Sequence, residues 1–127
     1  MENSKIIKTH LAPKAIGAYS QGILYGNLIF TSGQIPLDVK TNTIISEKFH
    51  DQAQQVLNNL KNLIESEGSS LEKIIKLNVY LTDLRNFDKL NEIFIDFFKN
   101  IYPARSVVEV SRLPKDSKIE IDAICYK

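Results

Sequence analysis

Hydrophobic and polar positions change their period several times along the chain, and each period predicts a different kind of element. In residues 49–68 and 86–100 the apolar side chains recur every three or four positions. This spacing gathers them on one face and predicts two amphipathic helices. Gly68 is expected to end the first helix, because glycine readily adopts a left-handed conformation, and Pro103 is expected to stop the second.

Alternating apolar and polar positions predict strands in other segments. Residues 73–83 alternate from Ile75 to Leu81, which is typical of a half-buried strand. Two apolar runs in residues 23–34 flank Gly26-Asn27, a dipeptide that favours a tight hairpin turn. A short strand and a looser hairpin are also predicted, at 5–10 and 36–45.

Two more alternating runs surround "LPKDSK" in residues 104–123 and predict a C-terminal hairpin. If residues 114–117 form its loop, Ser111 lies opposite Glu120. Arg105 and Glu120 then share one face of the sheet, with their backbones roughly 20 Å apart in one chain. One subunit alone is not expected to bring these two side chains onto one small ligand.

The order of these elements predicts a single domain over residues 1–127 with an α+β fold. Two helices packed on one face of a mixed sheet bury the apolar stripes of both helices. The other face of the sheet is left uncovered, and apolar residues there favour oligomerisation. The residues expected on this face are Val107 or Val108, Ile119 or Ile121, and Leu77 or Asn78.

Composition narrows the class of protein without identifying a function. The 127 residues are 43% hydrophobic and 24% charged, with a formal net charge of +1. This balance gives no reason to expect a nucleic-acid partner, which usually requires a basic surface. The single cysteine, Cys125, excludes an internal disulfide. No apolar run resembles a signal peptide or a membrane span, so we expect a cytoplasmic protein without a membrane partner.

Few residues are candidates for chemistry. His10 and His50 have no carboxylate or thiol at ligand spacing, so no metal site is expected. Cys125 is interpreted as a small apolar residue of the last strand. Phosphate-binding glycine motifs and the G-x-S-x-G elbow are absent. The polar residues in unusual places are Tyr19, Ser32, Arg105 and Glu120, together with Gly33, and each of them alone also has an ordinary structural explanation.

Four motifs together are more specific than any of these residues alone. They are "IGAYSQG", "FTSGQIPLD", "YLTDLRNF" and "YPARSVVEVSRLPKDSKIEIDAI". In this order and without large gaps, the chain resembles the Rid family of reactive-intermediate imine and enamine deaminases, also called YjgF, from about residue 8 to 126. The most specific part of the resemblance is "PARS…EV…LPKD…IEI".

The resemblance implies a chorismate-mutase-like fold and a homotrimer with one site in each cleft between subunits. It implies hydrolysis of 2-imino acids, such as 2-iminobutanoate and 2-iminopropanoate, to 2-oxo acids and ammonia. Neither a cofactor nor a metal is expected. Two alternatives stay open: an endoribonuclease that inhibits translation, as an older family label says, and a non-catalytic ligand-binding trimer.

The resemblance also implies roles for individual residues. Arg105 corresponds to the arginine that binds the substrate carboxylate, Glu120 to the glutamate that orients water, and Tyr19 to a pocket tyrosine. Other substrate-binding positions correspond to Ser32, Gly33, Phe87, Asn91 and Val107.

Many relatives carry cysteine at position 107, where this chain has valine. That position contributes backbone groups to the ligand, and such groups survive the change to Val107. Because Arg105 and Glu120 are far apart in the predicted hairpin, we expect each site to join Arg105 of one chain to Glu120 of the next.

Overall fold

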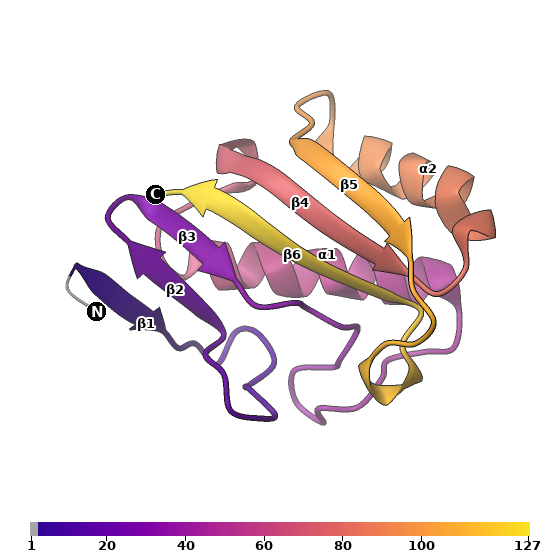
Figure 1. The fold of residues 1–127 in the computed structure, drawn as a ribbon, viewed down its shortest axis with the longest axis horizontal. Coiled ribbons are helices and arrows are strands. Elements are labelled where there is room, and N and C mark those ends of the chain that lie inside the picture. The colour runs from indigo at the N-terminus through magenta and orange to yellow at the C-terminus, as the bar shows by residue number, and fades with distance from the viewer. Residues whose placement is uncertain (1–2) are drawn as a thin grey trace.

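The computed structural model of the protein describes residues 3–127 and combines one six-stranded sheet with two α-helices (Figure 1). None of the helices in this range is long and apolar enough to cross a bilayer. The elements in chain order are β1 Ser4–Ile7, β2 Gly22–Tyr25, β3 Leu28–Thr31, α1 Phe49–Glu65, β4 Ile74–Leu81, α2 Phe87–Phe98, β5 Ala104–Glu109 and β6 Ile119–Tyr126. Short 3₁₀ turns occupy Leu71–Lys73, Leu84–Asn86 and Pro114–Asp116.

The strand order in the sheet is β1-β2-β3-β6-β4-β5. Neighbouring strands are antiparallel except β4 and β5, which are parallel and are connected through α2. The predicted C-terminal hairpin is therefore wrong, because β4 lies between β5 and β6. After β4 the chain continues through α2 and returns as β5, which pairs with one edge of β4. The segment after β5 then passes the end of β4, and β6 pairs with the other edge of β4. The Val110 N–H donates to the Leu81 carbonyl at 2.8 Å along this path.

Both helices cover the same face of the sheet, as predicted, and the core lies between them and the strands (Figure 1). Every second residue of β6 is buried against the helices, from Ile119 to Cys125. On α1 the buried residues follow the predicted stripe, and they include Val56, Leu57 and Leu60. The described part of the chain is thus an α+β fold with one helix-covered face and one face open to solvent.

The open face differs from the prediction in two ways. Ile119 and Ile121 both point toward the helices, so neither lines the open face. The open positions of β6 are the even-numbered ones, because successive side chains of a strand alternate between faces. Ile75 is 45% exposed, because the β4–β6 register shifts between Ile74 and Lys76 and interrupts the expected alternation.

Apolar and polar residues occupy different halves of the open face. Register places Phe30 beside Ile124 and beside Ile23, which in turn pairs with Ile6. Exposed apolar residues on this half are Ile6, Tyr25, Leu28, Phe30 and Tyr126. The other half is polar: Asp122 accepts hydrogen bonds from the Asn78 amide at 2.8 Å and from the Tyr80 hydroxyl at 3.4 Å.

Local conformations explain where the elements end. Gly26 has φ +60° in the two-residue β2–β3 turn, which confirms the predicted hairpin. Gly68, with φ +88°, turns the chain shortly after α1. The second helix ends at Phe98 rather than at Pro103, because Lys99 and Asn100 adopt left-handed conformations. The looser hairpin predicted at 36–45 forms around an isolated bridge of Leu37 to Ile44. The Asp38 N–H donates to the Thr43 carbonyl at 2.8 Å, and the Ile45 N–H donates to the Pro36 carbonyl at 3.0 Å.

Candidate functional site

Arg105 lies on the edge strand β5 and points toward α2. In the parallel ladder it is opposite Leu77, whose side chain is buried under the helices, so Arg105 faces the same side. Its Nη2 donates to the Asn91 Oδ1 at 2.5 Å. The guanidinium carbon lies 5.4 Å from the centre of the Phe87 ring and 5.0 Å from that of Phe94. We call Phe87, Asn91, Phe94 and Arg105 the arginine half-site.

One stripe of α2 supplies all three partners of this arginine. Phe87, Asn91 and Phe94 stand at positions i, i+4 and i+7, which share one face of a helix. Partial burial lowers the pKa of Arg105, although a guanidinium stays charged in proteins. Next to the arginine is a cavity of about 540 Å³, lined by Asn91, Phe94, Ile95, Tyr102, Pro103 and Arg105.

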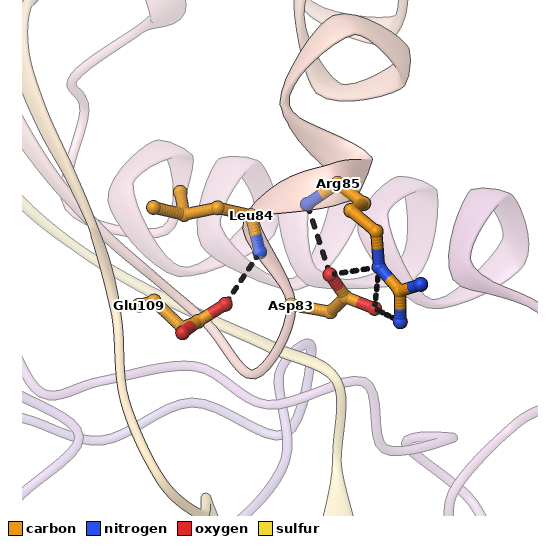
Figure 2. A network of polar contacts seen from close by, with 4 residues as sticks. All are labelled: Asp83, Leu84, Arg85 and Glu109. Carbon is orange, nitrogen blue, oxygen red and sulfur yellow. Dashed lines mark hydrogen bonds and ion pairs between the residues drawn. The ribbon is translucent and has the colours of Figure 1, made fainter.

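The start of α2 is fixed to the end of β5 by a small polar network (Figure 2). The Leu84 N–H, in the 3₁₀ turn before the helix, donates to the Glu109 carboxylate at 2.9 Å. Asp83 accepts from the Arg85 backbone N–H at 2.9 Å and also pairs with the Arg85 guanidinium. The Leu84–Glu109 bond thus ties the turn before α2 to the end of the strand that carries Arg105, and the Asp83–Arg85 contacts hold that turn together.

A second group of predicted residues gathers on the open face around Glu120. The side chain of Glu120, in β6, lies directly over Gly33, which follows the end of β3. A cavity of about 340 Å³ is lined here by Ile16, Tyr19, Ser32, Gly33, Ile35, Pro114 and Glu120. We call Tyr19, Ser32, Gly33 and Glu120 the glutamate half-site.

The environment of Glu120 makes its carboxyl a better proton acceptor than an ordinary surface glutamate. Burial raises its pKa, and the nearby negative charge of Asp122 raises it further. A higher pKa means that the carboxylate binds a proton more readily at neutral pH. The glycine at position 33 leaves room for this carboxylate, because a Cβ there would come within 2.7 Å of the Glu120 Cδ.

A buried glutamine holds the loop that carries Tyr19. Gln21 accepts from the Thr9 N–H at 2.7 Å and donates to the carbonyl oxygens of Thr9, Ala12 and Pro13. The backbone carbonyl of Gln21 accepts from the Ser32 N–H at 2.9 Å.

The hydroxyl groups of the glutamate half-site are also held by the backbone. The Ser32 hydroxyl donates to the Ser20 carbonyl at 2.6 Å, and the Tyr19 hydroxyl accepts from the Ile16 N–H at 3.2 Å. Gln21 was not predicted as a functional position. It lies within the motif "IGAYSQG", but a polar residue next to Gly22 in a loop also fits an exposed turn.

The two half-sites lie on opposite faces of the sheet, which corrects the prediction that Arg105 and Glu120 share a face. Arg105 is on the helix-covered side, and Glu120 is on the open side beside Tyr80. In the observed register their backbones are two strands and three residues apart, or roughly 14 Å. One chain therefore does not bring the two side chains onto a single small ligand.

The remaining candidate residues lie outside both half-sites. Val107 faces the helix side and packs against the core. Cys125 is fully buried on the same side of the sheet, and burial raises the pKa of its thiol. His10 is exposed in the loop after β1, and His50 is exposed in the first turn of α1. None of these side chains lines either half-site cavity.

Comparison with known proteins identifies close relatives over nearly the whole chain. A sequence model of the family described as "Endoribonuclease L-PSP" matches residues 9–127. A RutC family protein of Pyrococcus horikoshii is 51% identical over 123 residues, which cover 97% of this chain and 98% of the relative. A 2-iminobutanoate/2-iminopropanoate deaminase of Dermatophagoides farinae is 38% identical over 124 residues, covering 98% and 97%.

Solved structures agree with these sequence matches. The crystal structure of Escherichia coli TdcF with bound serine is 46% identical, with a TM-score of 0.92, and the match covers 97% of this chain and 98% of that one. The YjgF protein of the same species is 45% identical, also with a TM-score of 0.92, covering 97% and 98%. Sequence identity and fold thus agree from the first strand to the last, and the chain belongs to the Rid family, which is also known as the YjgF or L-PSP family.

Proposed function

We propose that the protein hydrolyses small 2-imino acids, such as 2-iminobutanoate and 2-iminopropanoate, to 2-oxo acids and ammonia. The observation that carries this proposal is Arg105, which is hydrogen-bonded to Asn91 and lies beside a cavity. The same chain also contains Glu120, a partly buried glutamate whose pKa is raised. Guanidinium groups recognise carboxylates through two parallel hydrogen bonds, and every 2-imino acid carries a carboxylate. The serine bound to the relative TdcF is likewise a small molecule with a carboxylate beside a nitrogen-bearing carbon.

The proposed reaction uses side chains and water alone. Arg105 holds the carboxylate, which fixes the imine carbon in position and angle. A water oxygen attacks that carbon as Glu120 accepts the water proton. Glu120 then returns this proton to the nitrogen, which gives a carbinolamine. The carbinolamine hydroxyl next gives its proton to the nitrogen through Glu120, the C–N bond breaks, and ammonia leaves as the C=O bond of the 2-oxo acid forms. Imines hydrolyse without a catalyst, so the residues need to supply only modest stabilisation.

A homotrimer would unite the two half-sites that one chain keeps apart. The apolar half of the open face is exposed in the monomer, and burying it against neighbouring subunits is favourable. In a closed ring each subunit presents its arginine half-site to one neighbour and its glutamate half-site to the other. Each cleft then contains Arg105 of one chain and Glu120 of the next.

Solution mass tests the trimer directly. Light scattering after size exclusion is expected to give about three times the chain mass of 14.4 kDa. The reason is that a monomer exposes the apolar half of the open face to water. A monomer also cannot bring an arginine half-site and a glutamate half-site together. A stable species of one chain mass that carries full activity would contradict this prediction.

Ammonia release tests the proposed function. A threonine dehydratase generates 2-iminobutanoate from threonine, and glutamate dehydrogenase reports ammonia through NADH oxidation. Adding this protein is expected to accelerate ammonia release beyond the uncatalysed rate. Carboxylate binding without acceleration would instead indicate a ligand-binding trimer, and cleavage of RNA without acceleration would favour the older ribonuclease label.

Gly33→Ala is expected to impair catalysis while leaving the fold intact. The new methyl group would occupy the space of the Glu120 carboxylate, which would swing away at little cost because it ends a flexible side chain. A displacement of this size is expected to lower kcat by about 10- to 100-fold. Gly26→Ala is the matched control: with φ +60° and open space around it, alanine there should cost about 1 kcal/mol of stability and leave kcat unchanged. Normal kcat in Gly33→Ala would contradict this role.

Cys125→Ser is expected to keep near-normal kcat and KM. The thiol is buried on the helix side of the sheet, away from both half-site cavities. The variant should lose about 1–3 kcal/mol of stability, because serine buries a hydroxyl among apolar side chains. Steady-state kinetics and urea unfolding measure the two effects separately. A folded Cys125→Ser protein without activity would show that the thiol takes part in the reaction.

A further inference from the structure

The guanidinium of Arg105 lies between two aromatic rings that differ in burial. Phe87, at the first turn of α2, is 40% exposed, whereas Phe94, two turns later, is only 5% exposed. Both ring centres are within 5.4 Å of the guanidinium carbon. Phe94 also belongs to the buried core cluster that contains Leu90 and Ile93. The deeper ring is therefore the one whose own position is fixed by packing.

We infer that Phe94 is a positioning residue, which holds the Arg105 guanidinium in place for the substrate carboxylate. This inference deepens the proposed function and rests on it. Phe94 has no polar group and need not touch the reacting atoms. Its contribution is to restrict where Arg105 can be.

Two contacts of different kinds restrict the guanidinium together. A cation over the face of a ring is attracted by the electrons of that ring, and this attraction strengthens when water is excluded. The Asn91 Oδ1 accepts from Nη2 and limits rotation of the group in its own plane. A guanidinium has five N–H donors, so four remain after Asn91 takes one. A fixed plane leaves a pair of parallel donors available to grip a carboxylate.

The sequence alone makes Phe94 look like an ordinary core residue. It belongs to the apolar stripe of α2, with Leu90, Ile93 and Phe98, all of which are buried. Of the buried residues in this stripe, Phe94 is the one with a ring contact to Arg105. Phe98 has the same chemistry, similar burial at 6%, and a ring contact to Phe94 instead. The helix thus contains a matched control for loss of an aromatic ring from the core.

The test compares Phe94→Leu with Phe98→Leu. Both variants should lower the urea midpoint by similar amounts, because each removes a buried ring. Only Phe94→Leu should weaken binding of 2-oxobutanoate, measured by calorimetry, by about tenfold, with a loss of at least the same size in kcat/KM. Phe94→Tyr keeps the ring face and should bind like the wild type. Phe94→Met, which keeps side-chain bulk without a ring, should repeat the loss and replaces Phe94→Leu if that variant does not fold.

A spectroscopic measurement reads the position of Arg105 without any reaction. The chain has only three arginines, so its arginine Nε–H spectrum is simple, and Arg105→Ala assigns the signal. Loss of the ring at position 94 should shift this signal, whereas Phe98→Leu should leave it in place. If the wild type released no ammonia, the proposed function would fail, and this shift together with 2-oxobutanoate affinity would still decide the role of Phe94. Unchanged affinity or an unchanged Arg105 signal in Phe94→Leu would overturn the inference.

Discussion

Arg105→Ala is expected to lower kcat/KM for 2-iminobutanoate by about 10²- to 10⁴-fold while the protein stays folded. The substrate carboxylate would lose two charge-assisted hydrogen bonds, each worth about 1.5–3 kcal/mol. Arg105→Lys should also be poor, because an ammonium is a point charge that does not fix the angle of a carboxylate. Coupled ammonia-release kinetics with each purified variant measure both effects.

Arg112→Ala is the matched control for loss of a guanidinium. Arg112 is exposed and pairs with Asp116 at 2.9 Å, four residues along the chain. Such an exposed pair contributes little to stability and lies outside both half-sites, so this variant should retain normal kinetics. Undiminished activity in a folded Arg105→Ala protein would remove Arg105 from the site.

Glu120→Gln is expected to lower kcat by about 10²-fold or more, because the amide cannot accept a proton from the attacking water. The same change should not weaken the fold at neutral pH. Burial raises the pKa of Glu120 in the folded protein, so the folded chain binds its proton more tightly than the unfolded chain does. Ionising this carboxyl therefore costs the folded state stability as pH rises from the ordinary carboxyl pKa through the raised one.

The sign of this linkage gives a measurement that does not depend on activity. At neutral pH Glu120→Gln should have a urea midpoint equal to or above that of the wild type, and the difference should shrink as pH falls below the ordinary carboxyl range. Glu92→Gln, at an exposed position of α2, controls for loss of one negative charge. A Glu120→Gln protein with normal kcat would exclude the proposed role in proton transfer.

Elements whose signal lies in local sequence were predicted correctly. The apolar spacing of 49–68 and 86–100 identified both helices, because a helical stripe needs no information about its partner. The turn at Gly26-Asn27 was recognised because a two-residue turn has a strong local preference for these residues. Helix ends were less exact, since α2 ends at Lys99, and lysine is not a typical left-handed residue.

Strand pairing was the main failure, because it depends on residues far apart in the chain. The alternating runs before and after "LPKDSK" have the sequence pattern of two strands joined by a short loop, which is the pattern of a hairpin. In the fold, β5 instead pairs with β4, since the crossover through α2 returns the chain to that edge. The wrong neighbour also produced the wrong face, so Arg105 and Glu120 were placed on the same side of the sheet.

The candidate site was predictable only where a motif carried it. Arg105 and Glu120 stood out as charges in alternating runs, and the resemblance gave them roles. Asn91 lies beside Arg105, and Gly33 lies beside Glu120. Phe94 was predicted only as a core residue. The apolar spacing of 86–100 indicates which side chains are buried, but it does not indicate that a charged group lies over the Phe94 ring.

The central claim is that each site joins Arg105 of one subunit to Glu120 of its neighbour, and subunit mixing tests it most directly. Arg105→Ala and Glu120→Ala chains, each inactive alone, are refolded together, and mixed trimers are isolated by two different affinity tags. In a closed ring, roughly one cleft in three of every mixed trimer receives both wild-type residues. These mixed trimers are expected to release ammonia at about a third of the wild-type rate. Mixed trimers that form and remain inactive would contradict the claim.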